Sequence, residues 1–137
     1  MSYYFATTLD TDFTTALARV REALKGEGFG VISEIDIRQT LKDKIGAEFR
    51  PYVILGACNP ALAHEALQME DKVGTMLPCN VVVQQTDDGV EVAAIDPVAS
   101  MQAIPNERLK DKAGQVADKL RRAIDALQRA DAHAGTG

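Results

Sequence analysis

The sequence predicts an α+β fold, a two-layer sandwich in which helices cover a mixed or mostly antiparallel five-stranded sheet, in the order βαβαβαββα. Segments with strand-like and helix-like spacing of apolar residues interleave along the chain. Near its end, Asp88-Gly89 separates two β-rich segments, which indicates a hairpin. A doubly wound parallel fold is less favoured, because no glycine-rich phosphate loop follows the first predicted strand.

The first half of the chain carries three strand signals and two helix signals. Aromatic and β-branched residues, an alternating pattern and a continuous apolar run predict strands at 3–8, 29–35 and 52–58. The last of these is typical of a strand that is central or covered on both faces. One helix follows Asp10–Asp12, with apolar residues at helical spacing: Phe13, Leu17, Val20 and Leu24. Asp36 is predicted to cap a short second helix.

The second half begins with a helix start signal, Asn59-Pro60, for a third helix that ends near Met69. A loop at 70–77, a hairpin of strands at 81–83 and 90–95, and a turn at Asp96-Pro97 follow. Asn106 starts a long last helix. Residues 1–129 therefore form one domain, and 130–137, which lack periodicity, are expected to be a disordered tail. The predicted core comprises Phe13, Leu17, Val20, Val53, Leu55, Val82, Val116, Leu120 and Ile124.

The composition argues against two classes of partner. The chain of 137 residues has 20 acidic and 15 basic side chains and no tryptophan, so it lacks the positive charge that gives affinity for nucleic acid or for anionic membranes. Its apolar runs are too short to span a membrane, and no signal-peptide pattern opens it. We therefore expect no nucleic-acid or membrane partner and a cytoplasmic protein whose two cysteines stay reduced.

Five segments of the chain carry recognisable motifs, in this order: Gly28–Val31, Glu34–Asp36, Phe49–Tyr52, Gly56–Pro60 and Leu77–Val83. Together they resemble the DUF302 family of unknown function, and the resemblance runs from about Tyr3 to Leu127. It implies a compact domain with a TBP-like sheet-and-helix architecture, and it implies a homodimer. It implies no activity, so whether the protein is an enzyme stays open, and no cofactor is identified.

Two Cys-Asn pairs are the strongest site candidates. Cys58 ends an apolar strand just before a helix, where the dipole and free N–H groups favour a thiolate, so Cys58 is the candidate catalytic residue. The alternative for it is a small buried core residue. Cys79 opens the next strand. The two thiols meet at one edge of the sheet if the strands run antiparallel and separate if they are parallel.

Three more residues complete the predicted ligand-binding set. His64 lies six residues after Cys58 and, with both cysteines, could form a soft-metal or thiol site, although a histidine on a helix of a small domain is usually a surface residue. Asn59 and Asn80 could orient a ligand or satisfy backbone groups, and we favour a cap for Asn59. Glu34 and Asp36 could act as paired carboxylates, but a cap at Asp36, with Glu34 solvated or paired with Arg50, is favoured.

These residues leave three functions open. The first is a module that binds a small ligand, a metal or a sulfur species in a pocket near Cys58, Cys79 and the third helix. The second is a thiol enzyme that acts through Cys58 and needs a positioned base. The third is a non-catalytic dimeric interaction domain whose motifs only specify the fold. An open cleft beside Cys58 would favour the first two, and a packed-in sulfur would favour the third.

Overall fold

The computed structural model describes the backbone of residues 2–136 and the side chains of residues 2–131. Its elements follow the predicted order, with two short helical segments added. They are β1 (Tyr4–Leu9), α1 (Phe13–Gly26), β2 (Gly30–Asp36), α2 (Ile37–Ile45), β3 (Tyr52–Cys58), α3 (Pro60–Met69), the 3₁₀ helix η1 (Asp71–Met76), β4 (Cys79–Thr86), β5 (Gly89–Ile95), α4 (Pro97–Ser100) and α5 (Glu107–Thr136).

The strands form one five-stranded sheet in the order β1-β5-β4-β3-β2. Every neighbouring pair is antiparallel, so the predicted α+β class is confirmed. The predicted hairpin joins β4 to β5, with Thr86 opposite Gly89. Gly89 has a φ of +142° there, and a Cβ would lie 2.5 Å from the carbonyl oxygen of Leu9. Glycine is therefore required at this position, both by the backbone conformation and by the close approach of β1.

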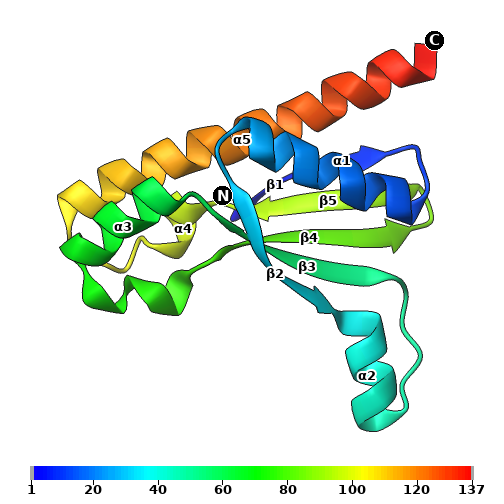
Figure 1. The fold of residues 1–137 in the computed structure, drawn as a ribbon, viewed down its shortest axis with the longest axis horizontal. Coiled ribbons are helices and arrows are strands. Elements are labelled where there is room, and N and C mark those ends of the chain that lie inside the picture. The colour runs from blue at the N-terminus through cyan, green and yellow to red at the C-terminus, as the bar shows by residue number, and fades with distance from the viewer. Residues whose placement is uncertain (1, 137) are drawn as a thin grey trace.

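Helices α1 and α5 lie together across one face of the sheet (Figure 1). The burial of β5 alternates accordingly, with Val90, Val92 and Ala94 buried and the residues between them only partly buried. The helices contribute buried residues such as Val20 and Leu120, which is fully buried. This apolar layer between sheet and helices forms the main core. The open face of the sheet is a separate surface.

The predicted core is correct except at one position. Val20, Val53, Leu55, Leu120 and Ile124 are buried, and the other helical members pack against them partly buried: Phe13, Leu17 and Val116. Val82 was predicted wrongly, because its neighbours Val81 and Val83 point into the core. Successive side chains of a strand face opposite sides, so Val82 lies on the open face of the sheet.

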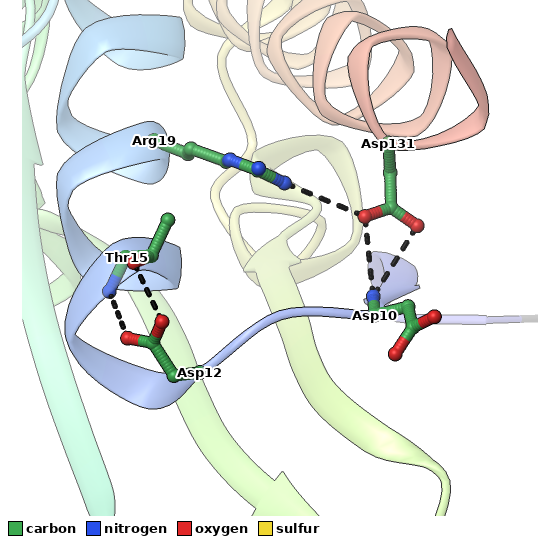
Figure 2. Close-up of polar contacts among 5 residues, drawn as sticks. All are labelled: Asp10, Asp12, Thr15, Arg19 and Asp131. Carbon is green, nitrogen blue, oxygen red and sulfur yellow. Dashed lines mark hydrogen bonds and ion pairs between the residues drawn. The ribbon is translucent and has the colours of Figure 1, made fainter. Parts of the chain in front are cut away.

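Helix α5 runs to Thr136, into the segment for which the sequence predicts a tail. Near its end, the Asp131 carboxylate accepts hydrogen bonds from the backbone N–H of Asp10, at 3.1 and 3.3 Å, and lies 3.4 Å from Arg19 Nη1 (Figure 2). These polar contacts tie α5 to the segment between β1 and α1. The spacing of apolar residues in the sequence does not predict these polar contacts. Within residues 2–136 no helix has both the length and the apolar character needed to cross a membrane.

Aspartate caps begin both early helices. Asp12 accepts hydrogen bonds from the backbone N–H and the hydroxyl of Thr15, each 2.8 Å long (Figure 2), and the backbone hydrogen bond is the main reason that the pKa of its carboxyl is lowered. Asp36 caps α2 by accepting from Gln39 N at 3.0 Å. The helix it starts projects beyond the ends of β2 and β3 (Figure 1) and has no buried residue.

The segments expected to be irregular form short helices instead. The predicted loop at 70–77 contains η1, and the predicted turn at Asp96-Pro97 is the start of α4, where Asp96 accepts from Val98 N at 3.0 Å. Together with α3 and the beginning of α5, these segments pack beyond the end of the sheet (Figure 1). They enclose a second, smaller core that includes Val73, Met101 and Leu109. The candidate site lies between the two cores.

Candidate functional site

A cavity of about 330 Å³ lies where β3 ends and β4 begins, bounded by α3, α4 and α5. We call it the α3–α5 pocket. Its lining is largely apolar and includes Leu62, Ala63, Ala66, Leu77, Leu109 and Ala113. Two further lining residues, Ile32 and Leu67, are 66% and 44% exposed, so apolar surface continues from the pocket out to solvent. The volume falls at the low end of the range of small-molecule pockets, roughly 300 to 1,000 Å³.

Cys58 and Cys79 both line this pocket. Strands β3 and β4 are antiparallel, and Cys79 lies opposite Ala57, the residue before Cys58. The end of one strand therefore meets the start of the other at a single edge of the sheet, which is the arrangement that a two-cysteine site requires. Both thiols are free. Cys58 is partly buried and Cys79 is only 5% exposed.

The buried thiol of Cys79 is held in its neutral form. Burial raises its pKa from 9.0 to about 11, because a thiolate would lose its hydration, and the nearby Cys58 adds a smaller increase. Cys79 is therefore a poor nucleophile near neutral pH. Any thiol chemistry in the pocket would begin at Cys58, which solvent and ligands can reach more easily.

Asn59 caps α3, as the sequence predicts. Its Oδ1 accepts a hydrogen bond of 3.2 Å from the backbone N–H of Leu62, and Pro60 occupies the first helical turn. Asn59 also lines the α3–α5 pocket. The cap fixes the direction in which α3 leaves β3, and it thereby positions Leu62 and Ala63 over the cavity.

Two of the predicted site residues lie elsewhere. His64 is exposed on α3, with its Nε2 3.3 Å from Gln68 Nε2, and it does not line the pocket. Asn80 is exposed and borders a shallow hollow on the open face of the sheet, with Tyr52 and Val82. It follows Cys79 in β4, so its side chain points to the opposite face. Across the described residues, no group of three or more His, Cys, Asp or Glu side chains could hold a metal ion.

The paired carboxylates serve the fold. Glu34 accepts a hydrogen bond of 2.7 Å from Arg21 Nη2, and Asp36 is the α2 cap. The alternative pairing of Glu34 with Arg50 is not found, because Arg50 Nε donates to Gln84 Oε1 at 2.9 Å. The structural interpretation of these two acids is therefore the correct one.

The family model described as "Domain of unknown function DUF302" matches residues 5–127. The chain belongs to the DUF302 family. Among solved structures it is similar to the uncharacterized conserved protein DUF302 from Bacillus stearothermophilus, at 29% sequence identity and a TM-score of 0.85. The match covers 91% of this chain and 98% of the other. The comparison with curated proteins finds no match.

The wall that α5 contributes to the pocket, and the charged residue in that wall, were not predicted from the sequence of this DUF302 domain. Lys112 in α5 lines the cavity, with 22% of its side chain exposed, and forms an ion pair with Glu65 in α3. The sequence shows that Lys112 lies beside the apolar stripe of α5, next to Ala113. It does not show that α3 packs against α5, because the spacing of apolar residues does not indicate which helices pack together.

Proposed function

We propose that this DUF302 domain binds a small, mainly apolar molecule in the α3–α5 pocket, beside Cys58 and Cys79. The observation that carries the proposal is the combination of a cavity of about 330 Å³ with an apolar lining that contains only a few polar groups. Small-molecule sites have this character, since apolar walls provide affinity and a few polar groups fix orientation. Among the ligand classes expected from the sequence, an organic molecule suits such a lining best.

Metal binding and thiol catalysis have less support. The cysteines supply two sulfur donors, whereas structural zinc sites use four ligands, and His64 is exposed outside the pocket. A thiol enzyme would also need a base within hydrogen-bond reach of Cys58. The histidine that the sequence offers near Cys58 is His64, which is exposed and does not line the pocket. Binding therefore ranks above catalysis, and a reactive or sulfur-containing ligand remains compatible with it.

We expect Ala63→Phe to weaken the binding of 1-octanol, a neutral probe of suitable size. Ala63 lines the pocket, so a phenyl ring there would fill space that the probe needs. The cost to folding should be small, because the added volume enters a cavity and not a packed core. Binding would be followed by chemical-shift changes in NMR titrations, with at least a tenfold loss of affinity expected, about 1.4 kcal/mol.

Ala61→Phe provides the matched control. Ala61 lies in the same helix but is exposed and outside the lining, so this variant should bind 1-octanol like the unchanged protein. Equal affinity of the Ala63→Phe variant and the unchanged protein would argue that the probe binds elsewhere. No binding by the unchanged protein would argue against the proposed function for ligands of this class.

We also propose a homodimer through the open face of the sheet. This face bears the exposed apolar side chains of Tyr4 and Ile35, which are 42% and 47% exposed, and Tyr52 and Val82 border its shallow hollow. Apolar side chains gathered on an uncovered sheet face are typical of an interaction surface. Sedimentation equilibrium at micromolar concentration should return about twice the 14.8 kDa of one chain. A mass of one chain would contradict the dimer.

A further inference from the structure

Lys112 joins the α3–α5 pocket to a second hollow of different character. The second hollow is polar, and its lining comprises Glu65, Gln68, Met69, Arg108 and Lys112. An apolar cavity and a polar one thus share a single lysine. A charged side chain that is only 22% exposed beside apolar walls is stabilised only when it is paired, and the carboxylate of Glu65 provides one partner.

The charges at this junction leave a surplus of positive charge. Lys112 and Arg108 carry two positive charges and Glu65 carries one negative charge. Within residues 2–131, Arg108 takes part in none of the ion pairs. The surplus stands out because the whole chain has a net charge of -5. One net positive charge, at the point where an apolar cavity meets a polar one, matches a ligand with one negative charge at the end of an apolar body.

We infer that the ligand is an amphipathic monocarboxylate, with its hydrocarbon part in the α3–α5 pocket and its carboxylate at Lys112 and Arg108. This inference rests on the proposed function and adds the chemical class of the ligand. A cavity of about 330 Å³ corresponds to about eleven water-sized units of about 30 Å³. That volume suits a chain of roughly eight to ten carbon atoms. The carboxylate of such a ligand is a monoanion. The neighbouring Glu65 carboxylate repels a monoanion less than it would repel a dianion.

Isothermal titration of the full chain with octanoate and with 1-octanol tests the inference. Octanoate should bind roughly tenfold or more tightly than 1-octanol, because only the carboxylate gains charge-assisted hydrogen bonds. Lys112→Gln should reduce this preference, measured as the ratio of the two affinities, by roughly tenfold, because the lost charge acts on octanoate alone whereas a change in the pocket wall acts on both probes. Lys110→Gln is the control, since Lys110 lies on the same helix outside both hollows and pairs with Glu107. It should change neither affinity.

Glu65→Gln should have the opposite effect. Removing this carboxylate frees Lys112 and raises the net positive charge, so octanoate should bind more tightly while 1-octanol does not respond. Equal affinities for octanoate and 1-octanol in the unchanged protein would overturn the inference and leave the proposed function standing. Binding of neither probe would count against both. Octyl phosphate binding more tightly than octanoate would overturn the carboxylate assignment in favour of a phosphate head group.

Discussion

The substitution Val83→Lys should unfold the domain, whereas Val82→Lys at the adjacent position should leave it folded. Val83 is fully buried between the sheet and the helices, so its replacement would place an unpaired charge in the main core. The cost of such a charge is about 3 to 5 kcal/mol, a large part of the roughly 5 to 15 kcal/mol that stabilises a typical domain. Circular dichroism should show loss of structure, or a urea midpoint far below that of the unchanged protein.

Val82→Lys is the matched control for this prediction. Val82 is partly exposed on the open face of the sheet and borders the same hollow as the acidic Glu91, so in a single chain a lysine there can keep its charged group in water. At a protein concentration at which the chain is monomeric, we expect a change in the free energy of unfolding within about 1 kcal/mol. Equal losses of stability in the two variants would show that the alternation of β4 is not as the structure has it.

This pair of valines also marks what could be predicted from the sequence. The helix boundaries were accessible because Asp12, Asp36 and Asn59 are local caps, recognisable from a few neighbouring residues. It was not possible to predict which residues of β4 face the core and which face the open side of the sheet. Three consecutive valines, Val81–Val83, carry no polar residue to mark the solvent face, and the burial of each depends on which face the helices cover.

Only the part of the candidate site that depends on the relative direction of β3 and β4 could be predicted from the sequence. Cys58 and Cys79 end and begin their strands, so antiparallel pairing alone brings them to one edge of the sheet. To predict where His64 points, one needs the orientation of α3 about its own axis, which the helix cap does not specify. Lys112 required the packing of α5 against α3, two helices that are far apart in the chain. In both cases the missing information was how α3 packs against the rest of the fold.

Iodoacetamide should modify Cys58 faster than Cys79 near neutral pH. Only the thiolate reacts, and a pKa of about 11 leaves Cys79 with about one thiolate in three thousand molecules at pH 7.5, about a hundredfold less than a pKa of 9.0 would give. Its 5% exposure slows access of the reagent further. Mass spectrometry of peptides after timed alkylation would measure both rates. Similar rates in urea, where burial is lost, provide the control.

The same raised pKa predicts how stability depends on pH. Because the pKa of Cys79 is higher in the folded state than its ordinary value of 9.0, the folded state holds this proton more tightly. The stability linked to it is fully present below about pH 9 and is lost as the pH rises toward 11, by about 3 kcal/mol at most. Cys79→Ala should lack this part of the alkaline loss, although lysines and tyrosines titrate in the same range in both proteins. Parallel stability curves for the two proteins between pH 9 and 11, together with equal alkylation of both cysteines, would show that Cys79 is not held neutral by burial.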